Sequence, residues 1–363
     1  LYSEQGGSHL DANTLQDLTL YYVTLPSDKL ELWFWLESER LLRPVFRQFH
    51  KEIGVIDEER RLRIESTPTG PVDEELRAVF WEDHPYSWNP MGHGDHLESV
   101  SRAEATEFFR LHYRADNLTA ALVGGFDPER VADWAQRYFG RLPHQDLPPA
   151  ETAPAAQPAT DEKRMESTCS CPPQAQILYP SARFGQADNY ALQLLSAILN
   201  GRTGRLYRDL VLGQQIAFSA FTQQVPWRRA GMFSFRAESK GETDPEALVV
   251  AWDQQVSRLQ SETPSQEEID RARNRLTADA FRSLKEPVGL MKQLLIYEGL
   301  GDWRYLNHWS GRIQQVTPED VVGVARKYLS RQRRTVAIYR RSPGESIDEA
   351  SGTRPQRPDG GAL

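Results

Sequence analysis

The stretch "SVSRAEATEFFRLHYRADNLTAALV" (99–123) has a counterpart later in the chain, "QVTPEDVVGVARKYLSRQRRTVAIY" (315–339). Each copy predicts a helix that leads into a strand. Ser101 and Thr317 are the N-caps, and Glu104 and Asp320 occupy the third helical position of a capping box. The two stretches therefore share one pattern at an offset of 216 residues.

Further pairs keep the same offset, and they are Ser27/Thr243, Asp28/Asp244, Leu32/Leu248, Phe108/Val324, Thr119/Thr335, Ala121/Ala337 and Leu122/Ile338. One register over about 100 residues indicates a duplicated domain. The alternative is that common helix-capping chemistry recurs by chance. A chain of 363 residues also fits two domains better than one.

The duplication and the composition together predict the domain boundaries. We expect a first domain over 1–143, a proline- and alanine-rich linker over 144–162, a second domain over 163–342 and a disordered tail over 343–363.

Strands and helices alternate in a way that predicts an α+β fold of two homologous domains. Each domain is expected to hold a mainly antiparallel sheet with helices on one face. The predicted helices are 27–45, 51–66, 74–81, 102–114, 127–140 and 187–201, and the predicted strands are 17–25, 118–126, 175–181, 216–224, 231–239 and 335–340.

The offset also predicts that the first domain is incomplete. Residue 1 corresponds to residue 217, so the first half has no counterpart of residues 163–216. That segment holds a strand and a helix, and a domain without them leaves a sheet edge and part of its core uncovered. Since the chain also begins without Met or a signal peptide, we expect a truncated sequence.

Composition excludes some partners. The net charge is −8 without a basic stripe, so we expect no nucleic-acid partner. No apolar run approaches the ~18 residues that a membrane span needs. Cys169 and Cys171 are too close in sequence for an ordinary disulfide and have no further metal ligands nearby, so we expect free thiols without a metal role.

The predicted helix "KEIGVIDEERRLRIES" (51–66) places two acids on its apolar face. Glu52, Val55, Ile56, Glu59 and Leu62 share that face, whereas Glu58 lies on the charged face with Gly54, Arg61 and Glu65. A buried carboxylate must be paired, protonated or bound to a cation. One interpretation is pairing with an arginine such as Arg43 or Arg63. Because Glu59 corresponds to Arg275, the duplicated fold does not require this acid.

Five stretches together resemble the pitrilysin/insulinase zinc peptidases, in particular the short bacterial members with two domains. They are "GGSHLDANTLQDLTLYYVTLPSDKLELWFWLESER", "VIDEERRLR", "HPYSWNPMGHGDHLESVS", "YRADNLTAALVGGFDPE" and "RYFGRLP". The resemblance implies the metallopeptidase αβ-roll and a Zn²⁺ cofactor. It implies that Glu59 is a zinc ligand and that Glu52 orients a ligand histidine. Asp11 and Ala12 hold the place of the family's Asn-Ala on the strand edge that binds the peptide substrate.

The sequence departs from the family in two respects. The inverted zinc motif H-x-x-E-H, which carries two ligand histidines and the general base, does not occur in these residues. Val211 and Phe218 stand where many members have an Arg and a Tyr that contact the substrate. The resemblance therefore implies a zinc-dependent endopeptidase subunit whose zinc-bound water is the nucleophile. This chain alone is expected to be inactive.

The resemblance also implies a homodimer or heterodimer with a companion subunit that supplies the Arg/Tyr pair, and a place in the bacterial periplasm. The alternative is a non-catalytic scaffold subunit of the same family, whose missing helix carries no zinc motif. Retention of Glu52 and Glu59 favours the peptidase, whereas Val211 and Phe218 favour the scaffold.

A second candidate metal site is His93-Gly94-Asp95-His96 with Glu98. Its glycines predict a surface loop in which nothing fixes both imidazoles on one side. His84 is expected to be a packed or capping side chain.

Overall fold

The computed structural model describes residues 1–143 and 161–342. The predicted tail and all but the last two residues of the predicted linker lie outside these ranges. The elements of the first half are β1 (Ser8–Thr14), β2 (Thr19–Thr24), α1 (Leu30–Leu42), α2 (Phe49–Arg60), the π-helical turn η3 (Arg61–Glu65), α3 (Gly70–Trp81), the 3-10 turn η4 (Pro85–Ser87), α4 (Gly94–Ser99), α5 (Arg102–His112) and α6 (Pro128–Tyr138).

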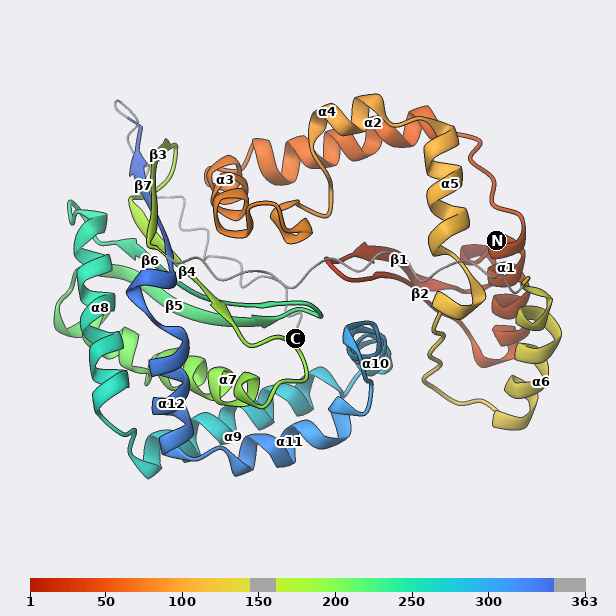
Figure 1. Ribbon diagram of the computed structural model, residues 1–363. Coiled ribbons are helices and arrows are strands. Elements are labelled where there is room, and N and C mark those ends of the chain that lie inside the picture. Colours follow the sequence, from red (N-terminus) through yellow and green to blue (C-terminus); the bar gives the residue numbers. More distant parts are fainter. Residues whose placement is uncertain (144–160, 343–363) are drawn as a thin grey trace.

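The second half follows with its own strands and helices (Figure 1). They are β3 (Lys163–Cys169), β4 (Gln174–Ser181), α7 (Ala187–Leu199), the π-helical turn η7 (Tyr207–Gly213), β5 (Ala217–Pro226), β6 (Gly231–Ser239), α8 (Pro245–Ser261), α9 (Gln266–Ser283), α10 (Pro287–Leu300), α11 (Tyr305–Gln315), α12 (Pro318–Tyr328) and β7 (Thr335–Arg341).

The helices of the two halves follow the same order. Helices α5 and α12 start and end 216 residues apart, and both open with a capping box. In each box the N-cap hydroxyl accepts from the backbone N–H of the third residue and the acid accepts in return. The predicted capping boxes at Ser101 and Thr317 are confirmed.

A five-stranded sheet organises the second half, with strand order β3-β7-β4-β6-β5. All neighbouring strands are antiparallel except β3 and β7, which run parallel. Helices α7, α8 and α12 cover one face and enclose the largest apolar core, which includes Ile177, Leu195 and Trp252 (Figure 1). The predicted α+β class with a mainly antiparallel sheet is confirmed.

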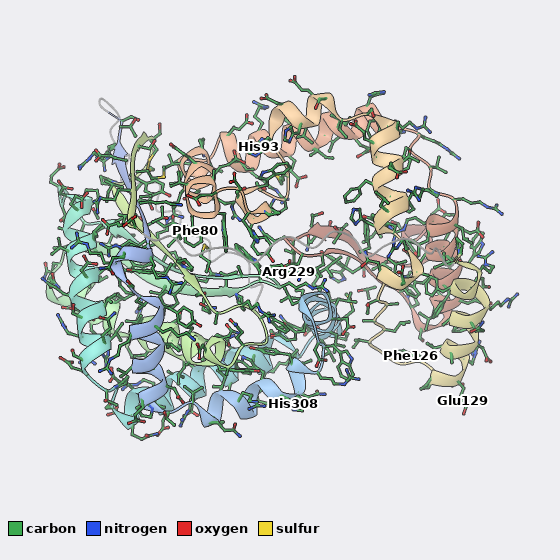
Figure 2. The ribbon with its side chains drawn as sticks, viewed as in Figure 1. Phe80, His93, Phe126, Glu129, Arg229 and His308 are labelled. Carbon is green, nitrogen blue, oxygen red and sulfur yellow. A yellow bond between two sulfur atoms is a disulfide. The ribbon has the colours of Figure 1, made fainter. Side chains whose placement is uncertain are left out.

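The other face of this sheet is covered by a helix from the first half. Val72 and Leu76 of α3 pack against Cys171, Leu178 and Tyr339. In Figure 2, Phe80 extends from α3 on the side of the helix that faces the sheet, in keeping with its packing against this cluster. The sheet is therefore covered on both faces, and the second cover is contributed by the other half.

The second half likewise covers a strand of the first, because its helix α10 packs on β2. Leu20 is buried there with Ile296 and Leu300. Helix α10 follows α9 as α3 follows α2, so each half contributes the equivalent helix to its neighbour.

The tips of two hairpins meet where the halves join. The carboxylate of Asp17, between β1 and β2, accepts from the Tyr86 hydroxyl (2.6 Å) and from the Arg228 backbone N–H (3.0 Å). The backbone N–H of Arg229, labelled in Figure 2, donates to the same Tyr86 hydroxyl (3.0 Å). These contacts fix the β1–β2 hairpin against the β5–β6 turn.

Two expectations are wrong. Residues 118–126 do not form a strand, because no strand in the described ranges supplies hydrogen bonds to them. Cys169 and Cys171 are not free thiols but form a disulfide. The turn from β3 to β4 brings their Cα atoms within 5.2 Å, a separation that a disulfide can bridge.

None of the helices in the described residues is both long and apolar enough to span a membrane.

Candidate functional site

The acid-bearing face of α2 and η3, made of Glu52, Val55, Ile56, Glu59 and Leu62, is largely uncovered by the rest of the described chain. Val55 and Leu62 are 52% and 57% exposed. Glu52 is exposed and Glu59 half-buried. The prediction that this face is buried is wrong for these residues, because nothing in the described chain packs on it.

The buried side of α2 carries Arg60 instead. Its guanidinium donates two hydrogen bonds to the Glu74 carboxylate (2.9 and 2.6 Å) and one to the Gly92 carbonyl (2.7 Å). Ile64 in η3, four residues further along the chain, is also buried. This charged anchor leaves the acid face of α2 free.

Glu58 and Glu59 have different partners. Glu59 forms an ion pair with Arg63 (3.0 Å), which agrees with the arginine-pairing interpretation. Glu58 is exposed and pairs with Arg61 (2.6 Å), as predicted for the charged face. Arg63 is 70% exposed, so its pair with Glu59 contributes little to stability and can separate.

Strand β1 carries the predicted substrate-binding residues Asp11 and Ala12. All seven of its residues are exposed, and β2 is its only strand neighbour in the described ranges. The Asp11 carboxylate accepts from the Tyr22 hydroxyl (2.8 Å) and from the Ala12 backbone N–H (2.8 Å), and these bonds lower the pKa of Asp11. Arg63 contributes to the same lowering. The charge of Arg63 thus acts on both Glu59 and Asp11.

The second half shows what the equivalent face of a helix contacts. Arg275 of α9 corresponds to Glu59, and its guanidinium donates to the carbonyls of Asn200 (2.7 Å) and Ala197 at the end of α7. Glu268 corresponds to Glu52 and accepts two bonds from Arg205 (2.8 and 2.9 Å), just beyond α7. In the second half this face therefore holds α7 and the segment that follows it.

Glu268 is expected to make stability depend on pH. The bond from Arg205 lowers the pKa of Glu268 to about 2, below the unfolded value near 4.5. Its contribution is present above pH ~4.5 and is lost as pH falls towards 2. The side chain is 22% exposed, so we expect Glu268→Gln to cost about 1–2 kcal/mol at pH 7.

The measurement is urea unfolding of both proteins at pH 7 and at pH 3. The difference in unfolding free energy between them should shrink at the lower pH. A difference that stays constant between the two pH values contradicts the assignment.

The residues present do not make a complete zinc site. Across 1–143 and 161–342, no three His, Cys, Asp or Glu side chains are grouped closely enough to hold a metal ion. A catalytic zinc takes three protein ligands and a water, and Glu59 offers one of these ligands. No reaction step is therefore assigned to zinc on these residues alone.

The histidines of the second candidate metal site pack against an aromatic ring. The rings of His93 and His96 lie 5.6 and 5.2 Å from that of Trp88. Gly94 begins the short helix α4, so the segment is not wholly the loop that its glycines predict. His84 is buried and caps η4 by accepting from the Tyr86 backbone N–H (3.1 Å), as expected for a capping side chain.

The positions of the family's Arg and Tyr are apolar in the structure as in the sequence. Val211 in η7 packs partly against the main core, and Phe218 on β5 is exposed. Neither side chain can donate a hydrogen bond to a developing oxyanion.

The contacts of Arg275 and Glu268 with the α7 region were not predicted from the sequence. The signal was present, because the offset of 216 already pairs Arg275 with Glu59 and Glu268 with Glu52. Only the structure shows that both positions reach the end of α7.

The fold and the offset repeat define an α+β protein built from two similar halves. Residues 99–276 match the family described as "Peptidase M16 inactive domain". The chain is a member of the M16 peptidase family.

The chain is similar to zinc protease PqqE of Helicobacter pylori, at 23% identity over 92% of this chain and 77% of that protein. It is also similar to human mitochondrial cytochrome b-c1 complex subunit 1, at 24% identity over 93% of this chain and 72% of that subunit. The crystal structure of a protease from Helicobacter pylori shares the fold, with a TM-score of 0.85 and 22% identity over 93% of this chain and 83% of that chain.

Proposed function

We propose that this chain is the zinc-side subunit of a zinc-dependent endopeptidase and is inactive by itself. The observation that carries the proposal is the uncovered acid face of α2, on which Glu59 lies. In the second half the equivalent residue, Arg275, donates a hydrogen bond to the Asn200 carbonyl just after α7. A histidine-bearing helix outside these residues, seated on α2 as α7 sits on α9, would lie beside Glu59.

The chain's own residues have defined tasks in this proposal. Glu59 offers a carboxylate oxygen to the metal and exchanges its ion pair with Arg63 for that role. Zinc, when bound by a complete ligand set, supplies an activated water. The exposed edge of β1 at Asp11 and Ala12 offers backbone groups to an extended peptide substrate. Glu52 is positioned to orient a ligand on the seated helix.

A companion subunit is part of the proposal. Because Val211 and Phe218 cannot donate a hydrogen bond to an oxyanion, the Arg/Tyr pair has to come from a different polypeptide in a heterodimer, since a homodimer repeats the same two apolar residues. The human relative is named as a subunit of a complex.

A scaffold subunit is the second candidate. The match to an inactive domain and the apolar Val211 and Phe218 favour it. The two candidates differ in whether Glu59 meets a metal.

The test compares the recombinant 363-residue chain with the protein purified from its own cells together with its natural polypeptides. We expect the cellular protein to contain zinc and to cleave a fluorogenic peptide, and the recombinant chain to do neither. Glu59→Gln in the cells should lower zinc content and cleavage by at least about 100-fold, since even residues behind metal ligands contribute 10–100-fold.

Glu58→Gln is the matched control, because Glu58 is the neighbouring acid on the opposite, exposed face. It should leave zinc content and cleavage unchanged. Cellular protein that holds no zinc with wild-type Glu59 overturns the peptidase proposal and favours the scaffold.

A further inference from the structure

Strand β5 forms one edge of the second-half sheet. It pairs with β6 on one side, and no strand in 1–143 or 161–342 pairs with its other side. An open edge offers backbone N–H and C=O groups to any extended segment that approaches it. The edge of β5 is therefore a place where an added strand can pair, unless other groups of the chain already occupy it.

A side chain occupies the middle of this edge. The Thr222 N–H donates to the side-chain oxygen of Asn200 (2.8 Å), and the side-chain nitrogen of Asn200 donates to the Thr222 carbonyl (2.7 Å). Both backbone groups of Thr222 thus point away from β6. Alternate residues of an antiparallel strand share this direction, so Ala220 and Gln224 present their backbone groups on the same edge. The Asn200 amide takes the place that one residue of an added strand would hold.

The Asn200 amide uses its full hydrogen-bonding capacity at this place. Its oxygen also accepts from the Thr222 hydroxyl (3.2 Å), and its nitrogen also donates to the Ser196 hydroxyl (3.2 Å). The Ser196 hydroxyl in turn donates to the Thr222 carbonyl (3.0 Å). Because a side-chain amide has two donors and two acceptor sites, all four are satisfied. A strand that pairs with Thr222 has to break these bonds and leave a half-buried amide without partners, which is costly.

The local structure holds Asn200 at the edge. The residue follows the end of α7, where the chain leaves the helix in an extended conformation (φ −90°, ψ 160°). Gly201 then turns the chain with a φ of +85°, a conformation that favours glycine. Helix α7 packs beside β5 (Figure 1). The Asn200 carbonyl accepts from the Arg275 guanidinium (2.7 Å), so the backbone is held independently of the side chain.

Strand β1 holds the corresponding place in the first half. Thr14 pairs with Thr19 of β2, and Thr222 pairs with Phe235 of β6. Thr19 and Phe235 are 216 residues apart, which is the offset of the internal repeat. Thr222 therefore corresponds to Thr14, two residues after Ala12. The occupied edge of β5 is the counterpart of the predicted substrate edge.

The edge of β1 is occupied far less firmly. All seven residues of β1 are exposed. At the predicted substrate-binding residues, the Ala12 N–H donates to the carboxylate of Asp11, the preceding residue (2.8 Å). Asp11 is an exposed side chain that water can solvate when this bond breaks. An incoming strand thus displaces it more easily than a half-buried amide with all its bonds made.

We propose that Asn200 closes the edge of β5 to strand addition and so directs extended peptides to β1. Asn200 is a positioning residue, because it acts by occupying the alternative edge and not by touching the substrate. The closure of β5 follows from the fold and requires no peptidase activity. The consequence that a peptide substrate pairs with β1 alone rests on the proposed function.

Hydrogen exchange in the presence of a probe peptide tests the closure. The probe is synthetic AFSAFTQQVP, the sequence of residues 217–226, because antiparallel pairing of two such strands about Thr222 places the outward groups of Ala220 and Gln224 opposite each other. Excess probe should leave exchange in 217–226 unchanged in the recombinant wild-type chain. In Asn200→Ala the probe should slow the outward amides of 217–226 by at least about 10-fold.

A second variant and a control accompany this measurement. Asn200→Asp keeps an acceptor for the Thr222 N–H but cannot donate to the Thr222 carbonyl, so the probe should slow exchange in the same direction by a smaller factor. Asn307→Ala is the matched control, because Asn307 is an exposed asparagine on α11, and it should behave as the wild type. Protection of residues 335–339, which are paired on both sides, shows that each variant is folded.

Slowing of 217–226 by the probe in the wild-type chain overturns the proposal, as does unchanged exchange of this segment in both Asn200 variants. Residues 8–14 report separately on β1. A probe that slows 217–226 in the variants but never slows 8–14 supports the closure by Asn200 and removes the support for β1 as the substrate edge. The two proposals therefore fail separately.

Discussion

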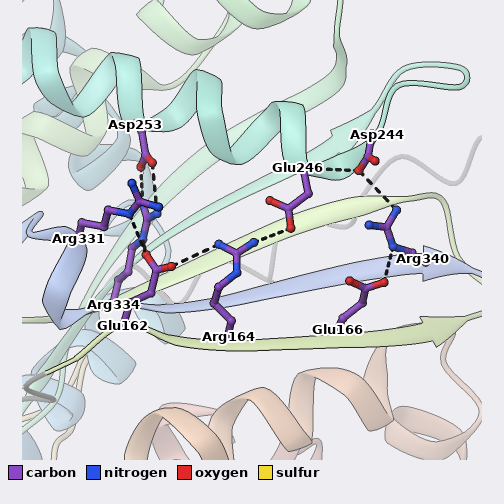
Figure 3. A network of polar contacts seen from close by, with 9 residues as sticks. All are labelled: Glu162, Arg164, Glu166, Asp244, Glu246, Asp253, Arg331, Arg334 and Arg340. Atoms are coloured by element: carbon purple, nitrogen blue, oxygen red, sulfur yellow. Dashed lines mark hydrogen bonds and ion pairs between the residues drawn. The ribbon is translucent and has the colours of Figure 1, made fainter.

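Replacing Arg334 by Met is expected to lower the free energy of unfolding by about 3 kcal/mol. Arg334 is 1% exposed and donates to Glu162 (2.8 Å) and to both oxygens of Asp253, one of them at 3.2 Å (Figure 3). Its removal leaves these two carboxylates without their central cation. The network joins the start of β3 to β7 and α8, so the sheet loses an electrostatic link.

Urea unfolding followed by circular dichroism measures this change. Arg331→Met is the matched control, because Arg331 contacts the same Glu162 (3.3 Å) but is 70% exposed. An exposed pair contributes at most about 1 kcal/mol, so the control should unfold near the wild-type midpoint. Equal losses in the two variants contradict the central role of Arg334.

Leu76→Ala is expected to cost about 2–4 kcal/mol through the cavity it leaves between α3 and the second-half sheet. Leu76 is 1% exposed and packs against residues from the other half. The loss should therefore loosen the contact between the halves as well as α3 itself.

Leu62→Ala is the control for this substitution, since Leu62 lies in the same half and is 57% exposed. It should change the unfolding free energy of the recombinant chain by less than about 0.5 kcal/mol. Thermal unfolding and hydrogen exchange of residues 70–81 distinguish the two variants. Fast exchange of α3 only in Leu76→Ala is the expected result, and no difference between the variants would refute the interface.

Local signals were sufficient to predict several elements. The strand pair predicted at 216–224 and 231–239 corresponds to β5 and β6, because alternating side chains and a short turn specify a hairpin. The capping boxes of α5 and α12 were equally accessible, because all their contacts lie within four residues.

Long-range contacts explain the errors. Residues 118–126 have the composition of a strand, but a strand forms only where another strand pairs with it, and the sequence of one segment does not report that. Strand β3 was not predicted, because "KRMESTC" is polar and its parallel partner β7 lies at the other end of the domain.

The acid face of α2 shows the same limit. Periodicity correctly placed Glu52 and Glu59 on one side with Val55 and Ile56, but it could not reveal whether a neighbour covers that side. Periodicity also predicted that apolar residues form the buried side of α2. In the structure Arg60 lies on that side and attaches α2 to α3 through two hydrogen bonds to Glu74. A buried ion pair leaves no apolar signal in the sequence.

The reciprocal placement of α3 and α10 has a consequence for how such a protein can be encoded. Each half covers the other's sheet through non-covalent contacts, which are apolar packing and hydrogen bonds such as those of Asp17 and Tyr86 with the β5–β6 turn. A gene divided between the two halves would yield two polypeptides, each with an uncovered sheet face that only the other can cover. The architecture of one chain is in this sense already that of an obligate heterodimer.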